Sequence, residues 1–97
     1  MDYLVDFTID IPEGTPPTDV DRRTHAEADR VGALAQEGHV LRVWRPVPED
    51  GRQRATGLYR ADDDAQRSAI LESLPFYEWM TIEVRALAPH PGDPARS

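Results

Sequence analysis

The first eleven residues alternate between apolar and polar side chains, with Leu4 as the exception. The apolar positions are Tyr3, Val5, Phe7, Ile9 and Ile11. Since successive side chains of a β-strand point to opposite faces of a sheet, this alternation predicts a strand with one buried face and one wetter face. Proline and glycine residues between positions 12 and 17 then end the strand and predict a loop.

A helix is predicted from Thr18 to Glu37. Thr18 is a suitable N-cap residue, the acidic residues after it suit the helix dipole, and Gly38 supplies the left-handed residue that commonly follows a helix. Residues at steps of three and four form one stripe along this helix: Val20, Thr24, Glu27, Val31 and Leu34, broadened by Ala28 and Ala35. The spacing predicts an amphipathic helix with this stripe facing the core.

The rest of the chain predicts three more strands, a second helix and an irregular tail. The strands are expected at residues 40–47, 52–60 and 81–87, and the second helix at 62–74. Pro48–Gly51 predicts the turn between the middle strands. Gly57 inside a strand indicates either a bulge or a close approach of another group to the backbone. The proline-rich tail, 88–97, is free to cross to another subunit.

Alternation and helical spacing also predict which side chains share a face. On the second strand they place one set, Val40, Arg42 and Trp44, opposite another, Leu41, Val43 and Arg45. On the third strand one face holds Gln53, Ala55, Gly57 and Tyr59. The second helix is expected to turn inward Ala65, Ala69, Ile70, Leu71 and Leu74. The acids Asp62–Asp64 are expected to solvate the start of that helix rather than to bind a metal.

The order strand, helix, strand, strand, helix, strand predicts a ferredoxin-like α+β fold. In this fold an antiparallel four-stranded sheet carries both helices on one face. All 97 residues are expected to form a single domain. The other sheet face also needs cover, since an exposed apolar face is an association site, so two such sheets are expected to pair into a barrel-like dimer.

Composition excludes several classes of function. The formal net charge is -7, which argues against nucleic acid as a partner, and there is no cysteine for a disulfide or a thiolate metal site. No apolar run approaches the ~18–20 residues of a membrane span, so a cytoplasmic protein is expected. All basic residues are arginine, which leaves no lysine for Schiff-base chemistry. No phosphate-binding loop or hydrolytic triad is present, and neither a cofactor nor a metal is predicted.

Glu27 is the sharpest candidate for chemistry because a carboxylate stands inside the apolar stripe. Desolvation there raises the pKa of a carboxyl group, and a group that titrates near neutral pH suits proton transfer. The alternative is a structural ion pair with Arg42 or Arg45. His25, at the border of the stripe, is either a second acid or base or a surface residue. His39, directly after Gly38, is expected at the helix end.

Several dispersed motifs are together similar to those of the muconolactone Δ-isomerases. They are Glu27, Gly38, Val43-Trp44-Arg45, Leu74-Pro75-Phe76, Trp79-Met80-Thr81-Ile82-Glu83-Val84 and His90-Pro91. The resemblance implies a barrel-type subunit of a homo-oligomer, from a dimer up to a decamer. It also implies cofactor-free movement of a double bond in a small unsaturated γ-lactone, by proton abstraction and return. The family's helix glutamate corresponds to Glu27.

Two departures from the family pattern predict a different substrate. The segment after Arg45 is longer than in the family, and Gln53 or Arg54 stands where a tyrosine lines the family's site. We therefore expect an isomerase or cyclase for a larger, natural-product-type substrate. Trp44 and Trp79 would shape its apolar pocket, and Arg42 or Arg45 would hold a carboxylate or enolate oxygen. The alternatives are a non-catalytic ligand-binding or oligomerisation module and a lactone-pathway hydrolase or dehalogenase.

Overall fold

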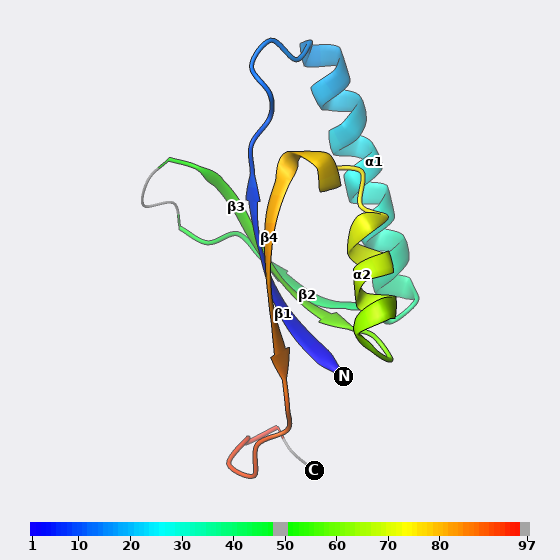
Figure 1. Cartoon of the computed structure of the whole chain (residues 1–97), viewed down its shortest axis with the longest axis vertical. Helices are drawn as coiled ribbons and strands as arrows, with labels where there is room; N and C mark the ends of the chain where they lie inside the picture. The colour runs from blue at the N-terminus through cyan, green and yellow to red at the C-terminus, as the bar shows by residue number, and fades with distance from the viewer. Residues whose placement is uncertain (48–50, 96–97) are drawn as a thin grey trace.

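The computed structural model describes residues 1–47 and 51–95. Its elements, in chain order, are β1 (Asp2–Ile9), α1 (Pro17–Gln36), β2 (Val40–Trp44), β3 (Gln53–Arg60), α2 (Asp64–Glu72), the short 3₁₀-helix η1 (Tyr77–Trp79) and β4 (Met80–Leu87). This order confirms the predicted succession of strands and helices (Figure 1). The predicted turn at Pro48–Gly51 lies mostly outside the described residues.

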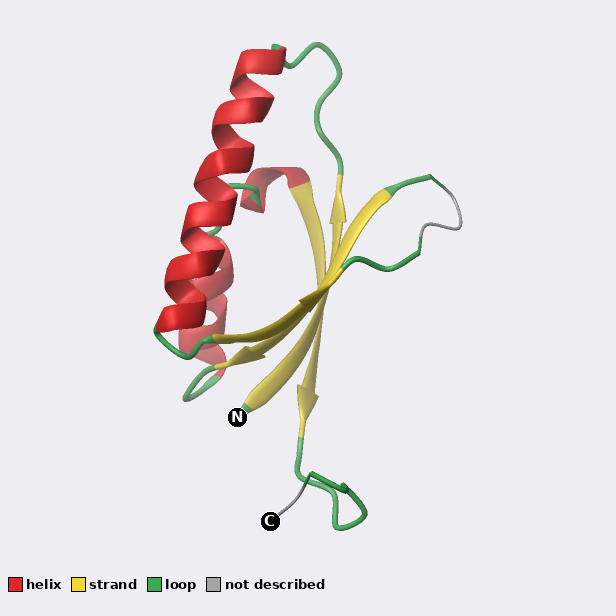
Figure 2. Ribbon diagram, turned by 180° about the vertical axis from the view of Figure 1, so that it is seen from behind, coloured by secondary structure: helices red, strands yellow, loops and turns green. Residues whose placement is uncertain are grey.

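The four strands form one antiparallel sheet in the order β2-β3-β1-β4. Both helices lie on the same face of this sheet, as Figure 2 shows, which confirms the ferredoxin-like α+β fold. We call this the covered face and the opposite side the open face. Tyr3, Val5, Phe7 and Ile9 of the central strand β1 are buried on the covered face, as their alternation predicts. No helix in the described part of the chain is long and apolar enough to span a membrane.

The start of α1 differs from the prediction, and its end agrees with it. The helix begins at Pro17, with Pro16 as its N-cap and no side-chain cap, so the prediction that Thr18 caps the helix is wrong. Proline suits the first helical position because its missing N–H has no partner there in any case. At the other end the prediction is confirmed: Gly38 has φ +84°. The His39 N–H donates to the Leu34 carbonyl at 2.8 Å, which completes a glycine C-cap.

The helices bury narrower stripes than the sequence predicts. On α1, Leu34 is buried and Val20, Glu27 and Val31 are half-buried, but three predicted members of the stripe are exposed: Thr24, Ala28 and Ala35. The reason is that α1 turns Arg30 toward the end of α2, where its Nε donates to Ser73 Oγ at 3.0 Å.

On α2, Ile70, Leu71 and Leu74 are buried as predicted, whereas Ala65 and Ala69 are exposed. Arg67 faces the sheet instead and lies over the Tyr3 ring at 5.1 Å. The helix is also shorter than predicted, since Asp63 caps it by accepting a hydrogen bond from the Gln66 N–H at 2.8 Å.

The strand β2 departs from its predicted length and faces. It ends at Trp44 rather than Val47, just before Pro46, which has no N–H for a ladder. A register shift between Val40 and Arg42 moves Val40 to the covered face, opposite Tyr59, while Arg42 and Trp44 pair with Leu58 and Thr56 on the open face. The prediction that Val40, Arg42 and Trp44 share a face is therefore wrong.

Candidate active site

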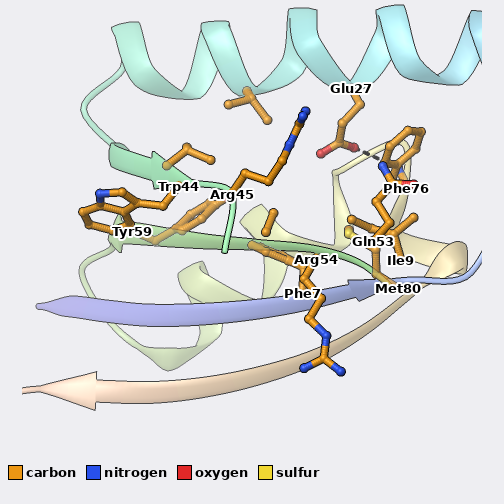
Figure 3. A pocket seen from close by; sticks show the side chains of 13 residues that line it. Phe7, Ile9, Glu27, Trp44, Arg45, Gln53, Arg54, Tyr59, Phe76 and Met80 are labelled. Carbon is orange, nitrogen blue, oxygen red and sulfur yellow. Dashed lines mark hydrogen bonds between the residues drawn. The ribbon is translucent and has the colours of Figure 1, made fainter. Parts of the chain in front are cut away.

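A cavity of about 310 Å³ lies between α1 and the covered face of the sheet (Figure 3). Its wall is mainly apolar, with contributions from Phe7, Ile9, Val31, Val43, Ala55, Phe76 and Met80. The polar residues that border it are fewer and come from separate elements: Glu27 of α1, Arg45 after β2, and Gln53, Arg54 and Tyr59 of β3. An apolar cavity with a few polar groups is typical of small-molecule sites.

Glu27 is the carboxylate of this cavity. Its Oε1 accepts a hydrogen bond from the backbone N–H of Phe76 at 2.9 Å. Burial raises the pKa of Glu27 above its ordinary value, and the hydrogen bond from Phe76 opposes this only in part. Among the described residues none forms an ion pair with Glu27, so the structural pair with Arg42 or Arg45 is not what holds this side chain.

The turn that meets Glu27 is fixed against α1 by a second residue. Arg23 lies one helical turn before Glu27, and its Nη1 donates to the carbonyl of Pro75 at 3.3 Å. The Arg23 guanidinium also lies over the Trp79 ring, 4.6 Å from its centre. Since residues four apart stand on the same helix face, Arg23 and Glu27 both hold the turn that carries Phe76.

Arg45 is the cation that lines the cavity without a partner in the described part of the chain. Figure 3 shows its side chain extending from the end of β2 toward α1, on the side where Glu27 lies. The Arg54 side chain, in contrast, points to the open face in the same view. A guanidinium with free donors next to an apolar wall is suited to binding an anionic oxygen.

Four of the residues selected from the sequence therefore border the cavity, namely Glu27, Trp44, Arg45 and Gln53, and three do not. Trp44 borders it from the end of β2, although the register of that strand places its side chain on the open face together with Arg42. His25 is exposed on α1, outside the cavity. Arg42 lies on the open face, with its guanidinium 5.0 Å from the centre of the Trp44 ring. Trp79 is buried behind the wall, where its ring packs against Phe76 at 5.5 Å. The Nδ1 of His39 is hydrogen-bonded to the Arg60 carbonyl, at the helix end where it was expected.

Tyr59 is the cavity residue that the sequence did not single out. It is 3% exposed and lines the cavity from β3. A Cβ on Gly57 would lie 2.5 Å from Cε1 of Tyr59, so the ring lies directly over the glycine. This confirms the close approach rather than the bulge as the reason for Gly57, since the register shift is in β2. The sequence does carry a signal for this contact, because alternation along the third strand places Gly57 and Tyr59 on the same face.

Two sequence relatives have different described functions and match different lengths of this chain. A putative RNA-binding protein of Synechocystis sp. is 36% identical over 61 residues, which are 62% of this chain and 60% of that protein. This match thus spans less than two thirds of that relative. Muconolactone Delta-isomerase 1 of Acinetobacter lwoffii is 29% identical over 91 residues, which are 94% of this chain and 92% of that protein.

Solved structures share the fold at low sequence identity. The crystal structure of a muconolactone isomerase superposes with a TM-score of 0.89 at 23% identity, covering 100% of this chain and 98% of the other. The 5-chloro-2-hydroxyhydroquinone dehydrochlorinase of Burkholderia phenoliruptrix, in complex with 2,5-dihydroxybenzoquinone, superposes with a TM-score of 0.66 at 13% identity, covering 91% and 94%. The family model described as muconolactone delta-isomerase matches residues 1–93. This chain belongs to the muconolactone delta-isomerase family.

Proposed function

We propose that this protein is a cofactor-independent isomerase or cyclase that transfers a proton on a small unsaturated lactone or a related carbonyl compound. The observation that carries the proposal is the environment of Glu27, a carboxyl group that faces an apolar cavity and has no paired cation among the described residues. Burial raises the pKa of this group toward the range in which it can both accept and return a proton.

In the proposed reaction Glu27 takes a proton from a carbon next to the substrate carbonyl, or next to a C=C bond that is conjugated with that carbonyl. The electrons of the broken C–H bond pass into the conjugated system, and a double bond moves as the carbonyl oxygen becomes an enolate oxygen. Protonated Glu27 then returns the proton to another carbon of the same system, so no atom is gained or lost. We assign a carboxylate or enolate oxygen of the substrate to Arg45, whose donors are free of described partners. No proton transfer is assigned to His25, because it is exposed outside the cavity.

The cavity supports a compact substrate rather than the larger one expected from the sequence. About 310 Å³ is near the lower end of the volumes of small-molecule sites. Gln53 stands where the family resemblance places a tyrosine, and it lines this cavity. We therefore propose that the preferred substrate is a natural-product-type lactone or carbonyl compound, with muconolactone and other simple lactones as slower substrates. We further propose that the protein acts in the cytoplasm as a homo-oligomer in which the open faces of two sheets pair.

The name of the Synechocystis relative raises RNA as a second ligand class. Proteins that bind RNA on a four-stranded sheet of this topology stack bases on aromatic side chains of the two central strands. The open-face residues of β1 and β3 are instead acidic, basic, hydroxyl-bearing or aliphatic: Asp2, Leu4, Asp6, Thr8, Arg54, Thr56, Leu58 and Arg60. This face offers no stacking aromatic on those two strands, so we propose a small molecule rather than RNA.

Hydrogen exchange on two lactones tests the proposal. Muconolactone carries a carboxylate and α-angelica lactone does not, and ¹H NMR in D₂O follows both isomerisation and solvent exchange at the ring carbons. We expect the wild-type protein to catalyse exchange on at least one of them, and Glu27→Gln to lower the rate by about 10²–10⁴-fold. The matched control is Glu72→Gln, which changes an exposed glutamate at the end of α2.

Two results would overturn this proposal. If the wild-type protein exchanges no hydrogen on either lactone, the lactone chemistry is wrong and a non-catalytic binding module is favoured. If Glu27→Gln exchanges hydrogen as fast as the wild type, Glu27 is not the proton carrier. Release of halide from a halogenated lactone without isomerisation would favour the dehalogenase alternative.

A further inference from the structure

Two buried tyrosines lie side by side on the covered face but have different hydroxyl environments. Tyr3 of β1 is directly opposite Tyr59 of β3 in the sheet, and the two are 0% and 3% exposed. The Tyr3 hydroxyl donates to Asp64 Oδ1 at 2.9 Å. The Tyr59 hydroxyl donates to none of the residues that the structure describes. Buried tyrosine hydroxyls usually have a partner, so the difference requires an explanation.

The Tyr59 hydroxyl can be reached from the cavity. Among the described residues, Arg67 Nε is the side-chain polar atom that is both fully enclosed and without a hydrogen-bond partner. The Tyr59 oxygen also has no described partner, so it is not fully enclosed. Because Tyr59 lines the cavity and is otherwise buried, its free oxygen is accessible from the cavity rather than from the outer surface. It is a hydrogen-bonding group turned to the space where a ligand would lie.

The surrounding residues fix the ring of Tyr59 in this position. Gly57 leaves the space that the ring occupies, since a Cβ there would lie 2.5 Å from Cε1. Phe7 packs against the ring from β1, with the two ring centres 6.0 Å apart. A phenol held between a glycine and an aromatic ring loses little freedom when it binds, which is what a preorganised donor requires.

The charges of the cavity keep this phenol protonated. Burial raises the pKa of Tyr59, and the negative charge of Glu27 raises it further. The hydroxyl therefore remains protonated, and so a donor, at neutral pH, and it does not compete with Glu27 as a base. Glu27 is thus suited to exchanging a proton, whereas Tyr59 keeps its own.

We propose that the Tyr59 hydroxyl donates a hydrogen bond to the carbonyl oxygen of the substrate, opposite the carboxyl group of Glu27. This inference rests on the proposed function and adds the group that binds the reacting oxygen. When Glu27 takes the proton from carbon, the carbonyl oxygen gains negative charge and its hydrogen bond to Tyr59 becomes stronger, while the phenol proton stays on Tyr59. Tyr59 thus supplies a phenol to the cavity that Gln53, at the position of the family's tyrosine, does not.

The first test compares Tyr59→Phe with Tyr77→Phe. Both remove one hydroxyl oxygen, but Tyr77 is 42% exposed on η1 and does not line the cavity. In the lactone exchange assay we expect kcat to fall about 10²-fold in Tyr59→Phe, as for the loss of one donor to an oxyanion, with KM changed much less. Tyr77→Phe should match the wild type. Equal kcat in all three proteins would overturn the proposal for Tyr59 while leaving the proposed function intact.

A second test does not depend on turnover. In Glu27→Gln protein labelled with ¹³Cζ-tyrosine and ring-¹³C-phenylalanine, saturated γ-butyrolactone is added, and Tyr59→Phe in the same background assigns the Tyr59 signal. We expect the Tyr59 signal to shift on binding, together with the ring signals of Phe7, while the Tyr77 signal stays unchanged. A shift at Phe7 without one at Tyr59 would show that the lactone occupies the cavity without touching the phenol, which overturns this inference alone. No shift at any cavity residue would overturn the proposed function as well.

Discussion

Carboxyl groups on the two sides of the sheet have pKa values that are shifted in opposite directions. On the open face, Asp2 accepts a hydrogen bond from Arg60 Nε at 2.8 Å, and this bond is the main reason that the pKa of Asp2 lies below its ordinary value. On the covered face, Glu27 accepts the backbone N–H of Phe76 and no other hydrogen bond from the described residues, and burial raises the pKa of its carboxyl group. The same functional group is thus held charged on one face and made easy to protonate on the other.

What separates the two faces is the supply of partners. The other acids of β1 and its end are also satisfied by side chains: Asp6 accepts from Thr56 at 2.7 Å, and Asp10 is paired with Arg52 at 2.9 Å. On the covered side of the sheet, by contrast, the Glu27 carboxylate faces a mainly apolar cavity. Burial of a carboxyl group without a paired cation, rather than the presence of an acid, therefore marks the position where proton transfer is possible.

Gly57→Ala should break the covered face most severely. The new Cβ would meet the Tyr59 ring at 2.5 Å, so the ring must move and the free energy of unfolding should fall by about 1–3 kcal/mol. Gly32→Ala is the matched control, because nothing lies within 4 Å of a Cβ there and alanine is favoured in a helix by about 0.5–1 kcal/mol. Urea denaturation of both variants measures the difference. An equally stable Gly57→Ala would contradict the account of this glycine.

Arg45→Gln should separate anionic from neutral substrates. If Arg45 binds a carboxylate, its loss should weaken the apparent affinity for muconolactone by about 10–100-fold, the value of a charge-assisted hydrogen bond. The KM for α-angelica lactone, which has no carboxylate, should change little. Steady-state kinetics on both lactones gives the comparison, with Arg22→Gln on the exposed side of α1 as control. An equal loss for both lactones would instead assign Arg45 to the enolate oxygen.

The pH dependence of stability should have opposite signs on the two faces. Glu27 binds its proton more tightly in the folded state, so its contribution to stability is present below about 4.5, its ordinary pKa, and is lost as the pH rises through the folded value. Glu27→Gln should therefore gain stability relative to the wild type as the pH rises. Denaturation from pH 4 to 8 measures this gain, and its absence would contradict burial of the charge.

Asp2→Asn should show the smallest effect and the reverse trend. Because the pKa of Asp2 is lowered in the folded state, its contribution to stability is present above about 3.8 and is lost as the pH falls through the folded value. The variant should be slightly less stable than the wild type at neutral pH and equal to it in acid. The effect is small since this ion pair is largely exposed to solvent.

The sequence predicted the fold and the position of Glu27 because both depend on local periodicity. The order of periodic segments indicates the sheet topology, and the step from Val20 to Leu34 marks Glu27 as an inward residue. Three predicted site residues do not line the cavity, namely His25, Arg42 and Trp79, each for an identifiable reason. Trp79 is buried behind the wall, against Phe76. His25 lies at the edge of a stripe that is narrower than predicted, and the register shift in β2 moves Arg42 to the open face.

The residues that were missed depend on contacts between distant parts of the chain. The Phe76 N–H reaches Glu27 across 49 positions in sequence, in a turn after α2 that no local pattern places against α1. Tyr59 has the pattern of an ordinary core residue, and only the cavity beside it distinguishes it from Tyr3. Periodicity can predict which side a residue faces, but it does not show whether the space next to that residue is filled.

The most direct test of this account is an NMR titration of the side-chain carboxyl carbons, with Glu27→Gln and Asp2→Asn used for assignment. We expect Glu27 to titrate above its ordinary pKa of 4.5 and Asp2 to titrate below its ordinary pKa of 3.8 in the same protein. A Glu27 that titrates at or below 4.5 would contradict the account, because the carboxyl group would then be either solvated or paired with a cation.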